Sequence, residues 1–347
     1  IDHVRAVLAE DPGAAVRAVG PRRPILHLAY SHHYRRVGTA TQLAVAELLV
    51  AAGADVDDSY PVSPVDPHPL SALYGALGHA GNMDLAAWLL ERGANPNDDE
   101  SLYHSTELGH ADGLRLLLRH GARPEGTNAL LRAMDFDDVE MVTALLDHGA
   151  DPNETELSAL HQAARRMCSA PMAELLVARG TDGTGLYSGH SAYGLARMQG
   201  NHAVADVLER AGQAGELAPG EALIAAAADG PVTGRVDPAT LTEEAKRSLT
   251  RLLRRAGTLA HAKRLVAIGI DPDWTDEQNL PAIHVAGWEG HADAVDWLLG
   301  FAPDFYRKND FGGDLMGTII HGAEFCPDRA ERDHLSCARQ VLAAGAP

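Results

Sequence analysis

Several features that define common classes of protein are scarce in this sequence. No apolar run in the 347 residues approaches the roughly 18 to 20 that a membrane-spanning helix needs. Lysine occurs only at Lys246, Lys263 and Lys308, and the formal net charge is −19, whereas a surface that binds phosphate groups needs clustered cations. We therefore expect a soluble chain whose partner is neither a nucleic acid nor a membrane.

Cysteines and catalytic motifs are scarce as well. The three cysteines, Cys168, Cys326 and Cys337, are an odd number in a large chain, which favours reduced thiols. No phosphate loop, nucleophile elbow, dinucleotide glycine fingerprint or H-E-x-x-H sequence occurs. An enzyme is therefore the less favoured interpretation, and no cofactor is expected. No basic and apolar leader opens the sequence, and its composition, rich in alanine and arginine, favours a bacterial, cytoplasmic protein.

The eighteen histidines raise the question of a metal site. Zinc prefers Cys and His ligands at compact spacing. A stretch near the C-terminus contains His321, Glu324, Cys326, His334 and Cys337, but no C-x-x-C or H-x-x-x-H spacing. We therefore predict no metal site.

What the sequence does contain is a tripeptide that returns after successive pairs of aliphatic residues. Gly-Ala-Asp or a variant of it begins at Gly53, Gly93, Gly121, Gly149, Gly180, Gly269 and Gly345. The first five of these glycines are 40, 28, 28 and 31 residues apart. A recurrence at this spacing indicates a chain built by stacking one supersecondary unit. Glycine suits the place because it adopts the left-handed conformation that ends a helix.

The pattern resembles that of the ankyrin repeat family, in which a repeat of about 33 residues opens its first helix with T-P-L-H-x-A. The segments that carry the resemblance are 24–29 (PILHLA), 159–164 (ALHQAA) and 282–286 (AIHVA). The resemblance implies an all-α solenoid of about nine helix-turn-helix repeats with short finger loops. The second helices of these repeats are marked by Leu48-Leu49, Leu89-Leu90, Leu117-Leu118, Leu145-Leu146, Leu175-Leu176, Leu208-Glu209, Leu265-Val266, Leu298-Leu299 and Val341-Leu342.

The ends and the middle of the array are irregular. Residues 2–8 and 14–19 are predicted to form a helical cap. Gly212 and Gly269 are 57 residues apart, where one repeat needs about 33, so an extra helix at 220–228 and a loop are expected between them. We therefore divide the chain into an N-terminal ankyrin block with its cap (1–212), an inserted helix and loop (213–239) and a C-terminal ankyrin block (240–347). A long open array of this kind favours a monomer.

The resemblance also implies a concave face lined by the first helices and the fingers. One equivalent position in successive repeats is occupied by His79, Glu107, Asp135, Arg165, Met198, Arg255, Trp288 and His321. The first four would form a polar row, and the insertion 32–38 would fold over one end of it. Such side chains suit acid–base chemistry on a small polar substrate, with His79, Glu107 and Asp135 as the candidate catalytic residues, or binding of a small molecule. Any hydrophilic concave surface displays them as well.

A protein–protein interaction scaffold with an acidic groove is the preferred hypothesis. Acidic residues gather at the fingers, where their field would steer a protein partner with a basic surface. The alternative is that these residues only serve the chemistry of solvated turns. Tryptophans can anchor an interface or simply pack between helices. The candidate contacts are Asp98, Asp99, Glu107, Asp135, Arg165, Trp274, Trp288 and His321.

Overall fold

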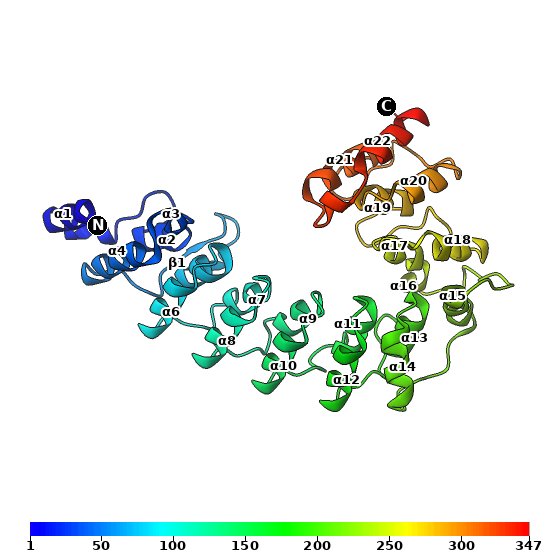
Figure 1. Ribbon diagram of the computed structural model, residues 1–347, viewed down its shortest axis with the longest axis horizontal. Coiled ribbons are helices and arrows are strands. Elements are labelled where there is room, and N and C mark those ends of the chain that lie inside the picture. Colours follow the sequence, from blue (N-terminus) through cyan, green and yellow to red (C-terminus); the bar gives the residue numbers. More distant parts are fainter. Residues whose placement is uncertain (347) are drawn as a thin grey trace. The chain divides into compact units, whose positions relative to one another are not determined.

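The computed structural model describes residues 1–346 and consists mainly of paired α-helices (Figure 1). Pro347, the last residue of the predicted C-terminal block, lies outside the described residues. The chain divides into two compact units, unit 1 from Ile1 to Glu154 and unit 2 from Thr155 onward. The division into blocks at residues 212 and 239 stays a prediction about which segments fold together.

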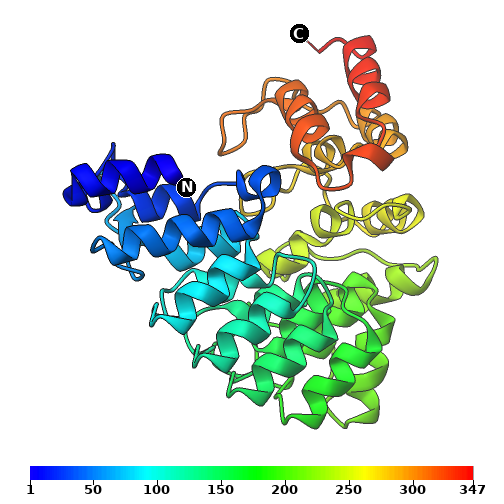
Figure 2. The ribbon, with the colours of Figure 1, turned by 60° about the vertical axis from the view of Figure 1, so that its left-hand side comes forward.

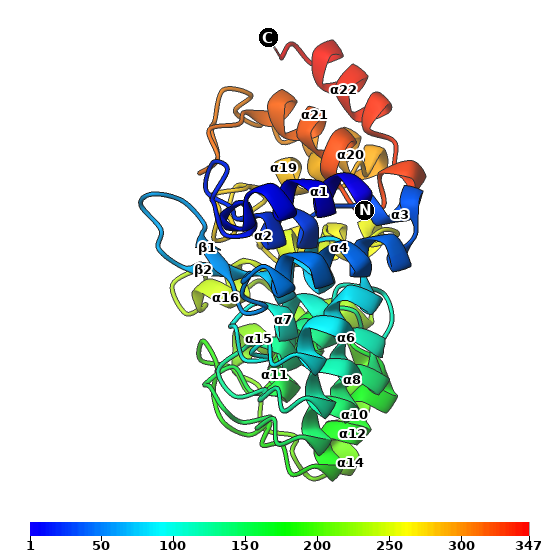
Figure 3. The same ribbon diagram turned by 90° about the vertical axis from the view of Figure 1, so that its left-hand side faces the viewer.

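Unit 1 contains a cap and the first four helix pairs. Its elements are α1 (Asp2–Glu10), the 3-10 helix η1 (Pro12–Ala15), α2 (Pro24–Ala29), α3 (Tyr34–Val37), α4 (Thr39–Ala51), β1 (Ser59–Pro61), β2 (Pro69–Ser71), α5 (Ala72–Tyr74), the π-helical η2 (Gly75–His79), α6 (Met83–Glu91), α7 (Ser101–Ser105), α8 (Asp112–Arg119), α9 (Ala129–Met134) and α10 (Val139–Asp147). Strands β1 and β2 pair in antiparallel register, with Tyr60 opposite Leu70, and form a finger. Figure 3 shows this finger on one side of unit 1 and the second helices α6, α8 and α10 on the other.

Unit 2 contains the remaining helix pairs and the insertion. Its elements are α11 (Ala159–Arg165), α12 (Ala170–Ala178), α13 (Ala192–Gln199), α14 (His202–Arg210), α15 (Pro219–Asp229), α16 (Glu243–Lys246), α17 (Ser248–Leu252), α18 (Leu259–Ala267), α19 (Ala282–Trp288), α20 (Ala292–Leu299), α21 (Leu315–Phe325), the 3-10 helix η3 (Arg329–Glu331) and α22 (His334–Ala343). First helices pack on first helices, as α11 does on α13 and α19 on α21, and second helices on second helices, as α20 does on α22.

The core of each unit is a column of aliphatic side chains from the predicted pairs. One member of every pair is at most 5% exposed: Leu49, Leu89, Leu117, Leu145, Leu176, Leu208, Leu265, Leu298 and Val341. Burying one leucine side chain stabilises a fold by about 1.5–3 kcal/mol. In a repeat array these side chains can be buried only by the neighbouring repeats that stack on them. In Figure 2 the helices of unit 1, blue to cyan-green, follow one another in layers. The predicted all-α repeat fold is confirmed.

Short polar side chains and glycines set the ends of the second helices. The Asn82 side chain accepts a hydrogen bond from the backbone N–H of Leu85 at 3.2 Å, and the Asp138 side chain accepts one from Met141 at 2.9 Å. These bonds satisfy N–H groups that the first turn leaves without a helical partner. Gly93 and Gly121 follow the last turns with φ of 94° and 89°, which favours glycine.

The structure confirms one half of the predicted cap and corrects the other. Helix α1 covers residues 2–8 as expected. The helix expected at 14–19 is wrong: the chain forms only η1 and then a tight turn, in which Val19 pairs with Arg22. Gly20, with φ of 64°, and Pro21 form this turn, and a left-handed residue followed by proline cannot continue an α-helix.

The predicted inserted helix is present and is part of the stack of unit 2. Helix α15 covers 220–228, and it packs against α13 and α18. Arg264 on α18 donates hydrogen bonds to the carbonyl oxygens of Ala227 and Ala228 at 2.6 and 3.1 Å. These bonds satisfy carbonyl groups at the C-terminal end of α15.

Candidate functional site

Two members of the predicted polar row, Glu107 and Asp135, lie at one site in unit 1 because an arginine binds both. Arg132 on α9 donates from Nε and Nη2 to Oε1 of Glu107 at 2.9 and 2.6 Å. Its Nη1 donates to Oδ2 of Asp135 at 2.9 Å. The sequence prediction did not include Arg132, which stands three residues before Asp135 and therefore on the same side of the helix.

The site continues through two histidines that stand earlier in the chain. His104 on α7 places Nδ1 2.7 Å from Oε2 of Glu107 and Nε2 3.0 Å from Oε2 of Glu100. Oε1 of Glu100 lies 2.7 Å from Nε2 of His68, which directly precedes β2 in the finger. We call this set of six residues the ladder: His68, Glu100, His104, Glu107, Arg132 and Asp135. It connects the finger to the first helices α7 and α9 of two successive repeats.

Charge stabilisation within the ladder sets the protonation of Glu107. Burial raises the pKa of this carboxyl group, but hydrogen bonds from His104 and Arg132 outweigh burial and hold the pKa below its ordinary value. Burial likewise lowers the pKa of Arg132, and its hydrogen bonds to Glu107 and Asp135 reverse the direction. A carboxylate stabilised in this way is a weak proton acceptor, so Glu107 is better suited to holding a cation than to acting as a general base.

Aromatic rings border the ladder. The ring centroids of Tyr74 and Tyr103 lie 4.9 and 5.0 Å from that of His104. The guanidinium carbon of Arg132 is 5.7 Å from the centroid of Tyr103 and 4.9 Å from that of Phe136, which is 51% exposed. The surface therefore combines carboxylates with exposed π faces, a combination that binds cations.

His79, the first member of the predicted row, is exposed and belongs to a different group of rings. Its centroid lies 5.2 Å from that of Tyr30 and 5.3 Å from that of His32. Burial, His32 and Arg22 lower its pKa. Within unit 1 the predicted row is thus two groups: His79 with its neighbouring rings, and the ladder. Arg165, its fourth member, belongs to unit 2.

The insertion 32–38 lies beside His79, as the sequence suggested. Tyr34 on α3 donates its hydroxyl hydrogen to the carbonyl oxygen of Ala80 at 3.0 Å, and Arg35 Nη2 donates to the same oxygen at 3.2 Å. These bonds join α3 to the end of η2 in the next repeat.

The two acidic finger residues of the predicted interface differ in availability. Asp98 Oδ1 accepts from the backbone N–H of Ser101 at 2.7 Å, and Oδ2 accepts from the Ser101 hydroxyl at 2.7 Å and from that of Ser71. Its carboxylate therefore caps the first turn of α7 through Ser101 and connects two repeats through Ser71. Asp99 is exposed, with φ of 64°, and lines a cavity of about 250 Å³ together with Arg123 and Glu125.

The other predicted contacts belong to unit 2. Arg165 is half-buried, and its guanidinium carbon lies 5.3 Å from the ring centroid of Tyr187. The ring of Trp288, also half-buried, lies 4.9 Å from that of His321, which in turn lies 4.6 Å from Phe325. Trp274 is half-buried at the start of a finger. Trp288, His321 and Phe325 form an aromatic column on first helices α19 and α21.

Met198 differs from the other residues at the equivalent position because its side chain is buried. It is 2% exposed, so it contributes to the core of unit 2 instead of a polar surface. Its burial is consistent with its apolar side chain.

The C-terminal Cys and His residues are used in packing. Cys337 is buried, and burial raises the pKa of its thiol to about 12. The Cys326 thiol donates to Oε2 of Glu289 at 3.7 Å, and His334 Nε2 lies 2.8 Å from the carbonyl oxygen of Trp288. Within residues 1–346, no three or more His, Cys, Asp or Glu side chains are grouped to hold a metal ion.

The comparison with protein families agrees with this geometry. The family model described as ankyrin repeats (3 copies) matches residues 73–156 and 102–187, which include most of the ladder. No curated protein matches the chain. In the part of the chain that the structure describes, no helix is both long and apolar enough to cross a membrane. Ankyrin repeats support a scaffold for protein–protein interaction. The chain contains ankyrin repeats, and the match to the family model lies within residues 73–187.

Proposed function

We propose that the chain is an interaction scaffold whose acidic groove in unit 1 binds a basic segment of a protein partner. The single observation that carries the proposal is the environment of Glu100. Its carboxylate is contacted by the imidazoles of His68 and His104, and by no arginine or lysine among residues 1–346. An arginine or lysine side chain of a partner supplies the missing permanent cation.

The electrostatics and the rings support the same class of partner. The pKa of Tyr74 is raised, first by burial and then by the negative charges of Glu100 and Glu107, which indicates a negative potential at this ring. The contacts of Arg132 show how this surface binds a guanidinium group. Its guanidinium lies near the rings of Tyr103 and Phe136 and donates hydrogen bonds to Glu107. The exposed Asp99 extends the acidic surface at the finger.

In unit 2 we propose a separate contact region of its own. Arg165, Trp274, Trp288 and His321 offer one cation and three half-buried or exposed rings. Large aromatic side chains at the centre of an interface carry much of its binding energy. We include in the proposal that the scaffold acts as a monomer in the cytoplasm. Its three cysteines are free thiols, which suits a reducing compartment.

A hepta-arginine peptide tests the charge of the groove. The full chain should bind it with an affinity that falls steeply as salt is added, because exposed ion pairs are screened. Replacing Glu100 and Glu107 together by glutamine should weaken binding about tenfold. The matched control is the pair Asp112→Asn and Glu140→Gln, which removes the same charge from second helices, where both side chains are exposed.

Fluorescence anisotropy of labelled peptide gives both affinities. Equal loss in the two double variants would show that net charge alone attracts the peptide, and it would refute the groove as the binding site. Loss confined to the Glu100 and Glu107 variant supports the proposal.

A small-molecule or acid–base function is the second candidate, favoured by one observation. His104 lies between the carboxylates of Glu100 and Glu107, an arrangement that can hold a polar molecule or relay a proton. Against it, Arg132 already occupies Glu107, and the lowered pKa of Glu107 weakens it as a base. A metabolite that raises the melting temperature of the wild type, but not of Glu107→Gln or His79→Ala, would establish this function instead.

A further inference from the structure

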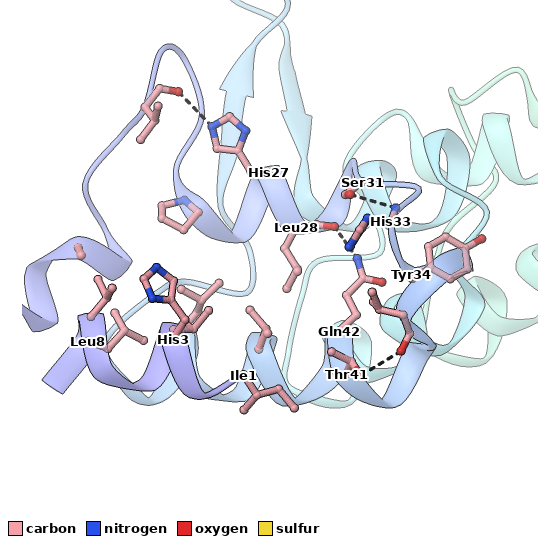
Figure 4. Close-up of a pocket in the computed structure, with 18 residues that line it drawn as sticks. Ile1, His3, Leu8, His27, Leu28, Ser31, His33, Tyr34, Thr41 and Gln42 are labelled. Carbon is pink, nitrogen blue, oxygen red and sulfur yellow. Dashed lines mark hydrogen bonds between the residues drawn. The ribbon is translucent and has the colours of Figure 1, made fainter.

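A large cavity in unit 1 is separate from the ladder and is formed by the cap and the first repeat. It has a volume of about 810 Å³ and lies between α1 on one side and helices α2 and α4 on the other (Figure 4). Pockets that bind small molecules have volumes of about 300–1,000 Å³, so the cavity can enclose a ligand of ordinary size.

The walls of the cavity are mainly aliphatic. Helix α1 contributes Val4, Val7 and Leu8, and the opposite wall contains Leu28, Val45 and Leu49. None of the α1 residues is fully buried, and Val7 is 39% exposed, whereas one member of each second-helix pair in the repeats is at most 5% exposed. Helix α1 therefore holds an apolar face over a space that its side chains do not fill. An alkyl chain in this space would remove that face from water.

Most polar groups in the walls already have protein partners. Gln42 donates from Nε2 to the carbonyl oxygen of Leu28 at 2.6 Å, and Thr41 donates its hydroxyl hydrogen to that of Val37 at 3.0 Å. The hydroxyl of Tyr34 is used by Ala80, as described above. The walls therefore have little capacity to bind a ligand with many polar groups.

Imidazole rings are the exception. His3, His27 and His33 all line the cavity, and Figure 4 shows His3 on the α1 side and His33 on the opposite side. His27 has its Nε2 3.0 Å from the carbonyl oxygen of Val19. The rings of His3 and His33 have no hydrogen-bond partner among residues 1–346. Each carries at least one N–H donor, and protonation adds a second donor and a positive charge.

We propose that this cavity binds an aliphatic carboxylate. Its alkyl chain lies against the apolar side chains of α1, α2 and α4, and its carboxylate accepts a hydrogen bond from the imidazole of His3 or His33. The histidines determine the sign of the head group, because a carboxylate pairs with an N–H donor and a cationic head group does not. This site is independent of the proposed groove, since none of its lining residues belongs to the ladder.

Dodecanoate and dodecyltrimethylammonium, which share one alkyl chain and carry head groups of opposite charge, test the proposal. Isothermal titration of the full chain below the micelle concentration should show one site for dodecanoate, at least about tenfold tighter than for the cation, a difference that one charge-assisted hydrogen bond can provide. The replacement of both His3 and His33 by alanine should abolish this preference. His110→Ala, at an exposed histidine outside the cavity, should retain it.

Two variants that fill the cavity locate the site. Val45→Phe enlarges a wall residue of α4, and Val7→Trp does the same from the exposed α1, where a larger side chain disturbs the core least. In either variant, if it folds, the affinity for dodecanoate should fall by about tenfold or more. Val65→Phe, at a position of the finger that is 93% exposed, is the control and should bind normally.

Three results would overturn the proposal. Dodecanoate binding that persists in Val7→Trp places the alkyl chain elsewhere. Equal affinity for both amphiphiles refutes the role of the histidines. Loss of binding in Val65→Phe as well shows that filling the cavity is not what weakens binding in the other two variants.

Discussion

A buried histidine in unit 2 provides the sharpest prediction about how the inserted segment is held. His190 is 1% exposed and lies at the end of a finger, directly before Ser191, the N-cap of α13. Its Nδ1 bonds a carboxylate oxygen of Glu221 on α15, and its Nε2 bonds the hydroxyl of Thr242, the N-cap of α16. One imidazole thus joins the finger to the inserted helix α15 and to α16.

The loss in His190→Ala can be worked out from these contacts. Glu221 is 12% exposed, and its other oxygen accepts from the backbone N–H of Ala218 at 2.8 Å. A hydrogen bond to a charged group contributes about 1.5–3 kcal/mol and one to a neutral group about 1 kcal/mol, so removing the ring should cost about 3 kcal/mol locally. At about 1.4 kcal/mol per tenfold change, the opening equilibrium of the insertion should increase about 100-fold.

Hydrogen exchange read by mass spectrometry measures this opening directly, without requiring that a repeat array unfold in one step. Amides of α15 and α16 should exchange about 100-fold faster in His190→Ala. Those of α12 should change little, and the control His110→Ala should leave all of them unchanged. Glu221→Gln keeps an acceptor for Nδ1 and should have a smaller effect. Exchange in α15 within about twofold of the wild type would refute the assignment of His190 as the link.

Three other predictions concern the core and its pH dependence. Leu117→Ala, at a site that is 0% exposed, should lower the unfolding free energy by about 2–5 kcal/mol in urea, whereas Leu335→Ala at a 62% exposed site should change it little. Gly322→Ala should destabilise unit 2 by about 1–3 kcal/mol, because a Cβ atom there would lie 2.2 Å from the Trp288 carbonyl oxygen; Gly215→Ala, in open space, is the control in the same denaturation experiment. Burial and Arg307 lower the pKa of His284 from 6.5 to about 4, so the unfolded chain binds more protons between these values. Unit 2 should lose stability as the pH falls from 6.5 to about 4, and thermal melts of His284→Gln should show a smaller loss.

The repeat fold was predictable because its signals are local and recur. Each leucine pair followed by glycine predicts a helix and the place where it ends, and both signals lie within one repeat, as at Leu117 and Gly121. The error in the cap has the same origin, since residues 14–19 precede the first repeat and have no equivalent elsewhere in the sequence. There the tight turn at Gly20 and Pro21 determined the conformation.

The candidate site was predictable only in part. The repeat register placed Glu107 and Asp135 on one face, but their partners Arg132 and His104 were not predicted. Each stands three residues before the predicted position of its own repeat, one turn earlier on the same face of the helix. Comparing the repeats at this earlier position as well would have found both residues. The contact of His68 with Glu100 could not be found in this way, because it depends on how the finger folds back.

The two proposed sites of unit 1 arise from different parts of its construction, and this makes their tests independent. The ladder exists because one position recurs on successive first helices, so its charge can be altered without touching the cap. The cavity exists because α1 lies outside the repeat register and does not fill the space that a further helix pair would fill. Val7→Trp should therefore abolish dodecanoate binding and leave hepta-arginine binding unchanged, while the Glu100 and Glu107 variant should do the reverse. If each variant instead weakened both ligands, the substitutions would be acting through the stability of unit 1, and the assignment of two separate sites would be wrong.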